Sequence, residues 1–409
     1  FLYLNSFTEY RTQNCDATQA MKMAMKRSFT AIIASAATTL FGFVALVFMK
    51  FRIGSDLGIN LVKGIVISFI SVMIFLPALT LCCCKLIDRT KHRRLVPDLK
   101  NVGKGMLKLK IPALILVVLL VVPCFLAQSH TTFIYGTGDA SETSRIGMDE
   151  QRINEKFGRS NAIVLLVEKG DPAREAELCD ELQQIEHVDS VISFATSVGA
   201  EIPDEYLDKS ITEQFYSENY SRIIVYTDTD DEGEVAFSVV ENVQEKAEQY
   251  YNQVLSCGQS ANLLDIKNVV SQDSSRVNII AIISIALVLL FTFRSLSLPV
   301  ILLFTIEAAI WINLSVAYFA GNSLSYIGYL VINTVQLGAT VDYAILLTET
   351  YTKNRKMMKK KEALKASVGE TFGSILTSAI ILAGAGFCLG MVSTNTIISE
   401  LGILLGRGT

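Results

Sequence analysis

Seven apolar blocks, each long enough to cross a lipid bilayer as a helix, dominate this sequence of 409 residues. Crossing a bilayer takes about 20 apolar residues in a helix, which satisfies every backbone polar group internally. Hydrophobic residues make up 51% of the chain, which favours a polytopic membrane protein over a soluble one. The predicted spans are Phe29–Met49, Asp56–Cys83, Ile111–Ala127, Val277–Phe293, Leu298–Phe319, Ser325–Thr348 and Phe372–Val392.

Both ends of the sequence continue the apolar pattern. The opening "FLYL" has the composition of the tail of a further span, and another helix is expected from Ser399. The sequence has neither an initiator Met nor a signal peptide. We therefore expect these residues to be a fragment of a longer protein.

Charge is distributed unevenly along the chain. Residues 128–275 hold 29 Asp and Glu against 10 Lys and Arg, and the rest holds 11 against 26. Basic residues in short loops mark the cytoplasmic side of a membrane. The pattern therefore predicts a multi-pass protein of the cell (plasma) membrane, with loops 85–110 and 353–365 cytoplasmic and 128–275 extracytoplasmic. That acidic block is unsuited to nucleic-acid binding.

The sequence pattern of the acidic block, residues 128–275, indicates a soluble α+β domain. Strands are predicted at 161–168, 187–194, 221–228 and 253–258, with helices at 171–185 and 234–251. Two strand–helix–strand units of this length indicate a ferredoxin-like sandwich. Residues 262–276 then favour a helix that leads directly into the next span.

An internal repeat relates the two ends of the chain. Residues 20–49 align with 363–392 at an offset of 343, and one gap later "SDLGINLVKG" (55–64) aligns with "SELGILLGRG" (399–408). Both copies start on the predicted cytoplasmic side, so the repeat is parallel, as in some transporters. The counterparts of Asp342 and Tyr343 would then lie just before residue 1.

The stretch "LGATVDYAILLTE" (337–349) places Asp342 inside an otherwise uncharged apolar run. A charged side chain at the centre of a membrane helix costs roughly 2.5–3.5 kcal/mol even on the lenient scale. Burial also disfavours the charged form, so such a carboxyl can take up and release a proton near neutral pH. The alternative is a purely structural role, in which the Asp342 carboxyl is hydrogen-bonded between helices.

With "VDYAILL", a basic loop, then "SILTSA" and "SELGI", the whole chain resembles the resistance–nodulation–division (RND) superfamily, and its MMPL branch in particular. The resemblance implies an RND-like helix bundle of two parallel six-span repeats with a sterol-sensing-domain-like core. Each repeat would carry an extracytoplasmic domain after its first span. On that template, 1–110 ends the first membrane repeat, 111–127 is span 7, 128–275 is the porter-like domain and 276–409 holds spans 8–11 and the start of span 12.

The resemblance also implies that Asp342 and Tyr343 form a proton relay. Gly338 lies one turn before Asp342 on the same face, where it allows a facing helix to approach closely. Asn333, Gln336 and Thr340 share another stripe with Tyr343. That stripe fits a hydrated proton path and interhelical hydrogen bonds about equally well.

Three further charges lie within predicted spans. Glu307 has no family motif to explain it, and would either partner a basic group or line a cavity. Lys63 and Arg407 occupy matched positions in the repeat. They fit counter-charges to the relay acids, but equally fit cations that extend to the membrane surface or pair with Asp56 and Glu400.

No enzyme motif is present. The sequence has no GxxxxGK[ST] phosphate loop, its three His lack nucleophile partners, and its eight Cys show no zinc-ligand spacing. We predict a non-enzyme that needs no cofactor and no metal.

The predicted function is proton-motive-force-driven efflux of lipids or other hydrophobic amphiphiles, with protons and membrane lipids as partners. The alternatives are a non-transporting sterol-sensing-like lipid sensor or scaffold, and an accessory protein-export motor. The sequence does not determine the substrate, or the direction and stoichiometry of coupling. It also leaves open whether the protein forms a homo-oligomer and what the expected N-terminal half contains.

Overall fold

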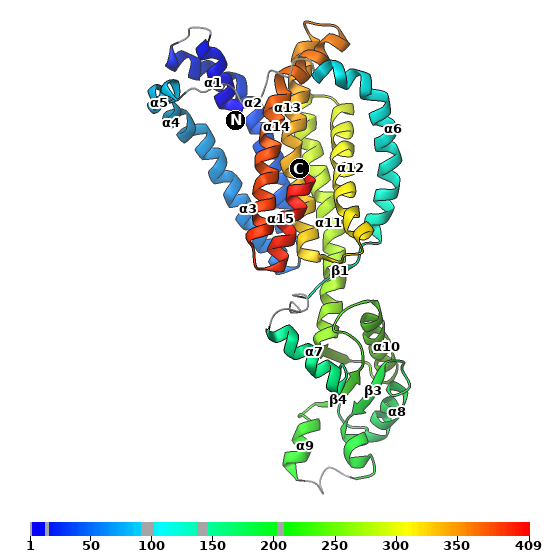
Figure 1. The fold of residues 1–409 in the computed structure, drawn as a ribbon. Coiled ribbons are helices and arrows are strands. Elements are labelled where there is room, and N and C mark those ends of the chain that lie inside the picture. Colours follow the sequence, from blue (N-terminus) through cyan, green and yellow to red (C-terminus); the bar gives the residue numbers. More distant parts are fainter. Residues whose placement is uncertain (1, 13–15, 91–101, 137–144, 203–207) are drawn as a thin grey trace. The chain divides into compact units, whose positions relative to one another are not determined.

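The computed structural model of this chain describes residues 2–12, 16–90, 102–136, 145–202 and 208–409. The chain separates into two compact units (Figure 1). Unit 1 comprises residues 1–133 and 272–409, and unit 2 comprises residues 134–271. Part of the predicted cytoplasmic loop 85–110, namely 91–101, lies outside the described residues.

Unit 1 is built almost entirely from helices. Within the described residues, seven helices are long and apolar enough to cross a membrane, and each coincides with one predicted span. The chain is therefore a polytopic helical membrane protein. Its elements are α1 (Leu2–Thr12), α2 (Ala17–Val47), α3 (Arg52–Ile70), η1 (Ser71–Phe75), α4 (Leu76–Cys82), α5 (Cys84–Arg89), α6 (Val102–Ser129), β1 (Phe133–Ile134), α11 (Gln259–Phe293), α12 (Ser297–Ala320), β6 (Leu324–Ser325), α13 (Tyr326–Arg355), α14 (Lys360–Val392) and α15 (Thr396–Gly408).

Glycines bring α14 and α15 into backbone contact. A Cβ added at Gly386 would lie 2.6 Å from the Gly406 nitrogen, and one added at Gly402 would lie 2.6 Å from the Gly390 nitrogen. In a membrane, lipid tails are as apolar as side chains, so close packing of small residues is what holds helices together. These four glycines therefore position α15 within the bundle.

The second predicted span is not one uninterrupted α-helix. It runs as α3, a π-helical turn at Ser71–Phe75 and α4. Pro77 near the start of α4 explains the interruption, because proline has no N–H and its ring clashes with the preceding turn of an α-helix. A wider π turn is a common way to accommodate such a break.

Unit 2 is an α+β domain. Its elements are α7 (Arg145–Phe157), β2 (Asn161–Glu168), α8 (Pro172–Leu182), β3 (Val188–Ile192), η2 (Ala195–Gly199), α9 (Lys209–Phe215), β4 (Tyr220–Thr227), α10 (Glu234–Tyr250) and β5 (Val254–Gly258). The four predicted strands and two predicted helices of this region are confirmed. The helix expected at 262–276 is confirmed as part of α11, which is continuous from Gln259 to Phe293.

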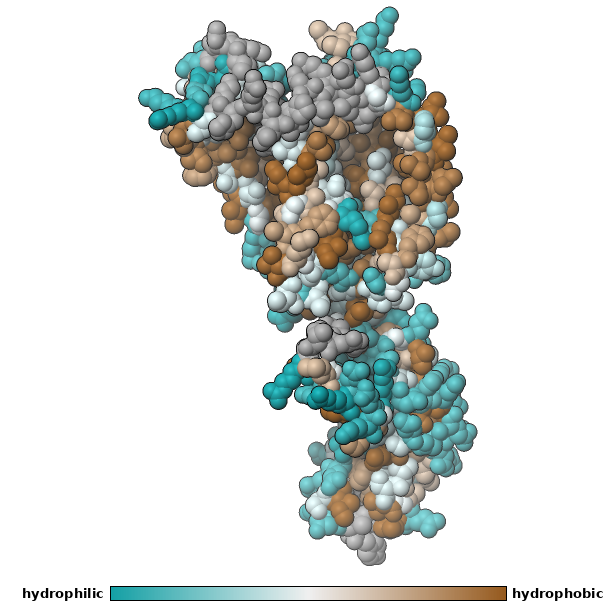
Figure 2. Space-filling view, in the orientation of Figure 1, coloured by the Kyte–Doolittle hydropathy of each residue, from teal (hydrophilic) through white to brown (hydrophobic). Residues whose placement is uncertain are grey.

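The sheet of unit 2 has the order β3-β4-β2-β5, and the three neighbouring pairs are antiparallel. Alternate residues of β2, such as Ile163 and Leu165, point into a core shared with Val240 of α10 and Leu178 of α8. Burying each such side chain contributes about 1.5–3 kcal/mol. On the face drawn in Figure 2, unit 2 is largely hydrophilic, whereas unit 1 has broad hydrophobic areas.

Candidate functional site

Asp342 lies on α13 where this helix crosses α2. The side chain of Ser35 on α2 lies beside its carboxyl. One carboxyl oxygen, Oδ1, is buried and has no hydrogen-bond partner among the described residues. Buried polar atoms in proteins are paired in the great majority of cases, so this carboxyl is an exception that calls for a reason.

The crossing of α2 and α13 is close because small residues line it. The Thr39 hydroxyl lies 3.1 Å from the Gly338 carbonyl across the crossing and 3.1 Å from the Ser35 carbonyl of its own helix, so its one proton is shared between them. A Cβ added at Gly338 would lie 3.3 Å from the Thr39 Cα, and one added at Gly42 would lie 3.6 Å from the Thr334 carbonyl oxygen. The face of α13 that carries Asp342 is therefore held directly against the backbone of α2.

This crossing joins the two copies of the internal repeat. Ser35 and Thr39 belong to the first copy, and Asp342 precedes the second copy on α13. Tyr343 is half-buried beside Asp342 and lies within electrostatic range of its carboxyl. A change of charge at Asp342 would act where the two repeats touch.

A second polar cluster joins α12, α13 and α15. Asn313 donates to the Gln336 side-chain oxygen at 2.9 Å and to the Leu404 carbonyl at 3.0 Å. Arg407 donates to the Asn313 side-chain oxygen at 2.8 Å and to its carbonyl at 2.9 Å. Gln336 in turn donates to the Gly408 carbonyl at 2.7 Å. We name Asn313, Gln336 and Arg407 the carboxamide cluster.

Several residues that the sequence predicted for a proton path or as charge partners lie in or near this cluster. Gln336 makes interhelical hydrogen bonds, which was one of its two predicted uses. Thr340 donates to the Gln336 carbonyl on its own helix at 2.7 Å, and Asn333 is buried. Arg407 contacts Asn313 and makes no ion pair with a carboxylate in the described part of the chain. Its repeat counterpart Lys63 is exposed.

Glu307 is a buried carboxyl on α12, with 7% of its surface exposed. Its Oε1 atom has no hydrogen-bond partner among the residues that the structure describes. Tyr329 on α13 is close enough to sense its charge. Neither of the described cations Lys63 and Arg407 pairs with it.

Sequence reasoning missed four polar residues of these contacts. Ser35, Thr39 and Asn313 lie within apolar spans, where each hydroxyl or carboxamide is a visible but unspecific signal. Asp273, near the start of a span, is 1% exposed, and its Oδ2 accepts the Phe51 N–H at 2.9 Å. That bond satisfies a backbone donor at the start of α3, as a helix cap does.

Glu400 has a comparable role. Its carboxyl accepts the Ser325 N–H, with distances of 3.0 and 3.2 Å to its two oxygens, at the start of α13. The structure thus gives Glu400 a backbone partner rather than Arg407. The pairing of these two charges was one of three alternatives that the sequence left open.

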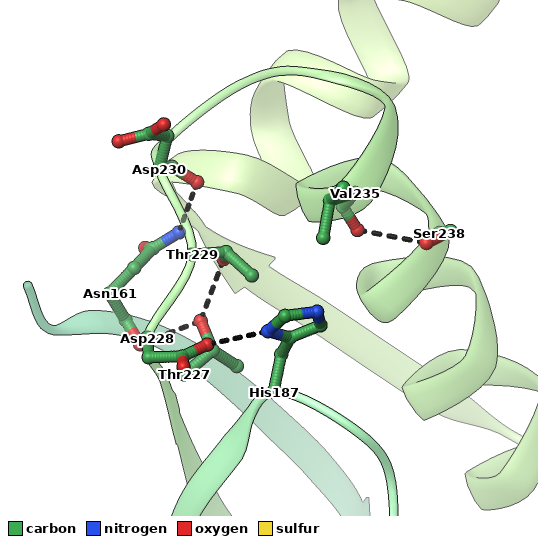
Figure 3. Close-up of polar contacts among 8 residues, drawn as sticks. All are labelled: Asn161, His187, Thr227, Asp228, Thr229, Asp230, Val235 and Ser238. Carbon is green, nitrogen blue, oxygen red and sulfur yellow. Dashed lines mark hydrogen bonds and ion pairs between the residues drawn. The ribbon is translucent and has the colours of Figure 1, made fainter.

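Unit 2 contains polar contacts that tie strand ends together (Figure 3). The His187 Nδ1 lies 2.9 Å from the Asp228 carboxylate. The Thr227 hydroxyl donates to the Asn161 carbonyl at 3.4 Å, and the Asn161 side chain donates to the Asp230 carbonyl at 3.4 Å. These bonds link the ends of β2 and β4 to the turn before β3. They stabilise one end of the sheet, where the central strands β2 and β4 meet the adjoining loops.

Deeper in unit 2, α8 carries two buried ionisable groups. Glu175 is 2% exposed and accepts hydrogen bonds from the Ser221 hydroxyl at 2.6 Å and from the Ala195 N–H at 3.2 Å. Burial raises the pKa of the Cys179 thiol to about 11. This thiol is 3.4 Å from the Ser193 hydroxyl, to which it donates.

Comparison with known proteins gives two curated relatives. One is a probable transport protein, MmpL4, of Mycobacterium leprae, 28% identical over 137 residues, which are 32% of this chain and 14% of that protein. The other is an apo-petrobactin exporter of Bacillus anthracis, 31% identical over 166 residues, which are 36% of this chain and 21% of that protein. The matched regions are thus small parts of both relatives.

The fold is similar to that of SecDF, a translocon-associated membrane protein from Thermus thermophilus, with a TM-score of 0.58 and 12% identity. That match covers 100% of this chain and 49% of SecDF. The model of the MMPL family matches residues 3–102 and 138–409, which are most of the sequence. This chain therefore belongs to the MMPL family.

Proposed function

We propose that this chain is part of a proton-driven transporter that exports a hydrophobic amphiphile. The observation that carries this proposal is the Asp342 carboxyl at the crossing of α2 and α13, whose buried Oδ1 has no hydrogen-bond partner among the described residues. Ionisable residues inside membrane spans are costly and are retained mainly for ion pathways and proton relays. Asp342 is therefore the proton-binding group, and Tyr343 is its neighbouring hydrogen-bonding group.

Proton binding at Asp342 would be coupled to movement because the site lies between the two repeats. A proton can drive a change between two packings only if its affinity differs between them. A difference of one pKa unit between the two packings supplies about 1.4 kcal/mol. The Thr39–Gly338 contact, one turn away, is the part of the interface that such a change would rearrange first.

The remaining parts of the chain fit an export machine. The four strands of unit 2 with α8 and α10 follow the order βαββαβ, with η2 and α9 inserted between β3 and β4, and this order supports a ferredoxin-like sandwich. We assign this unit to the extracytoplasmic side. We assign residues 353–365, which comprise the end of α13, the connection 356–359 and the start of α14, to the cytoplasm of a plasma-membrane protein because they are basic. The exporter of Bacillus anthracis, by its name, acts on apo-petrobactin, so a small molecule is also tested below.

The test reconstitutes the complete protein in vesicles and imposes a pH gradient. The readouts are quenching of a pH-sensitive dye and movement of a fluorescent phospholipid or a hydrophobic cationic dye. We expect Asp342→Asn to lower gradient-dependent movement about 100-fold or more, because an amide cannot exchange a proton at neutral pH.

Glu349→Gln is the matched control, because Glu349 is an acid on the same helix, close to Lys353. Glu349 is partly exposed, and we expect this variant to keep transport within about twofold. Proton-dependent transport by Asp342→Asn at the wild-type rate would contradict the proposal. Lipid binding without any movement in the wild type would instead support the lipid-sensor alternative.

A further inference from the structure

The sheet of unit 2 has two faces with different surroundings. Ile163 and Leu165 of β2 point into the core that α8 and α10 cover. Side chains of a strand alternate between the two faces of a sheet, so Val164 and Leu166 point to the opposite side, which we name the second face. Both are half-buried, whereas Leu165 is fully buried. The second face is therefore covered less completely than the core.

One row of the second face crosses all four strands. Val164 pairs with Ile224 of β4 and with Cys257 of β5, and Ile224 pairs in turn with Ile192 of β3. Side chains of paired residues lie on the same face of the sheet. Neighbouring strands are about 4.8 Å apart, so this row spans about 14 Å, which is close to the length of an extended dodecyl chain.

The next row contains Arg222, the single basic residue of the four strands. Leu166 pairs with Arg222 of β4 and with Leu255 of β5. Together the two rows form an apolar platform with a guanidinium at one side. Leu255 and Ile192, on the two edge strands, are 45% and 37% exposed. Exposed apolar surface of this kind, when polar groups border it, marks binding surfaces.

The guanidinium of Arg222 has an unused donor. The residue is half-buried, and its Nε atom is buried without a hydrogen-bond partner among the described residues. Glu168, two residues beyond Leu166 on β2, is exposed and forms no ion pair with Arg222 in the described chain. Because buried polar atoms are paired in the great majority of cases, this N–H calls for an acceptor that the described residues do not supply.

The chemistry of the donor favours a carboxylate as that acceptor. Arginine is always charged, and one edge of its guanidinium can donate two parallel hydrogen bonds to a carboxylate. A single arginine balances the one charge of a carboxylate, whereas a phosphate monoester carries about two. The surrounding region is acidic, with 29 Asp and Glu against 10 Lys and Arg in residues 128–275, so an anion is attracted to this cation and repelled by the surface in general.

We propose that the second face of this sheet binds a single-chain amphiphile with a carboxylate headgroup. The chain lies across the apolar platform, and the carboxylate accepts hydrogen bonds from the guanidinium of Arg222. Binding sites for small molecules commonly combine an apolar lining with a few polar groups that fix the orientation of the ligand. The inference deepens the proposed function and rests on it for its meaning in export, because it adds a headgroup to the exported amphiphile.

Calorimetric titration of the complete protein in phosphatidylcholine nanodiscs tests the headgroup, with empty nanodiscs as the blank. Dodecanoate should bind at least about tenfold more tightly than dodecanol, because hydrogen bonds to a charged group are the stronger ones. Arg222→Gln should remove this difference and leave the binding of dodecanol unchanged, which also shows that the face is still folded. Equal affinities of the wild type for the two compounds would overturn the proposal.

The matched control is Arg152→Gln, which removes the same charge at an exposed position of α7. It should leave the preference for dodecanoate intact, and a loss equal to that of Arg222→Gln would mean that only net charge matters. Asp342→Asn should bind dodecanoate as the wild type does. Since no pH gradient is used, a failure of this binding is distinguishable from a failure of proton-driven transport.

Protection of Cys257 locates the bound chain, because this exposed thiol belongs to the row that crosses the platform. Saturating dodecanoate should slow the reaction of Cys257 with a water-soluble maleimide about tenfold or more, measured by mass spectrometry. A cysteine introduced by Glu177→Cys, at an exposed position of α8 on the covered side of the sheet, should react at an unchanged rate. Undiminished labelling of Cys257 would place the ligand elsewhere and refute the proposal.

Discussion

Two acids on helices, Glu175 in unit 2 and Asp342 in unit 1, have different surroundings: Glu175 is buried as a whole, whereas Asp342 is partly exposed and has one buried oxygen. Both oxygens of Glu175 accept a hydrogen bond, one from the Ser221 hydroxyl and one from the Ala195 N–H. Asp342 lies beside Ser35, and its Oδ1 is buried without a hydrogen-bond partner in the described chain. Within the part of the chain that the structure describes, Glu307 likewise leaves its buried Oε1 without a hydrogen-bond partner.

The difference separates two uses of a buried acid. A carboxyl whose oxygens are all paired joins elements together, because it satisfies donors that would otherwise be stranded. A carboxyl with an unpaired buried oxygen adds little to stability and is free to change its protonation or its partner. Glu175 therefore has the environment of a structural acid, and Asp342 that of a functional one.

The largest effect that this comparison predicts is on the stability of unit 2. Glu175→Ala should destabilise the unit by about 3 kcal/mol, because it strands the Ser221 hydroxyl and the Ala195 N–H. Amide hydrogen exchange of β4 in the whole chain measures this loss. Glu177→Ala, at an exposed position of the same helix, should have almost no effect, and an equal effect of both would break the comparison.

The reaction rate of the Cys179 thiol measures how well the surroundings of Glu175 exclude solvent. The exposed Cys257 should react with a maleimide about 100-fold faster than Cys179, because the buried thiol reacts only after local opening. Labelling through opening should level off above about pH 8.5, where the exposed thiol is ionised. Labelling of the closed state would instead keep rising toward pH 11, because burial raises the pKa of Cys179 to about 11.

A smaller effect is expected for the stability of unit 1 when its functional acid is neutralised. Asp342→Asn should change the free energy of unfolding by less than about 1 kcal/mol, because the amide keeps a donor and acceptor beside Ser35. Thermal unfolding of the purified chain in detergent measures it. A loss as large as that of Glu175→Ala would show that Asp342 is structural after all.

The smallest effect concerns the interface beside Asp342. Thr39→Val keeps the shape of the side chain but removes its hydrogen bond to the Gly338 carbonyl, at a cost of about 0.6 kcal/mol. Thr8→Val, which removes a bond to the Leu4 carbonyl at an exposed position of α1, serves as the control. A change of more than about 2 kcal/mol at Thr39 would mean that the crossing of α2 and α13 is far more rigid than the coupling proposal requires.

The sequence by itself determined the seven spans, the strands of unit 2 and the repeat. These features depend on local rules. A helix in lipid needs about 20 apolar residues, and a buried strand such as 161–168 shows its apolar pattern directly. The resemblance to the MMPL family also followed from short motifs around Asp342, and the family match agrees with it.

Only the tertiary structure decided which polar residues meet. Asp342 and Ser35 are more than 300 positions apart in the sequence, and Arg407 contacts Asn313, which no charge rule would have selected. Lys63 and Arg407 occupy the same place in one motif, yet one is exposed and the other binds a neighbouring helix. The reason is physical: a motif fixes which groups a helix face offers, whereas packing against other helices fixes what those groups contact.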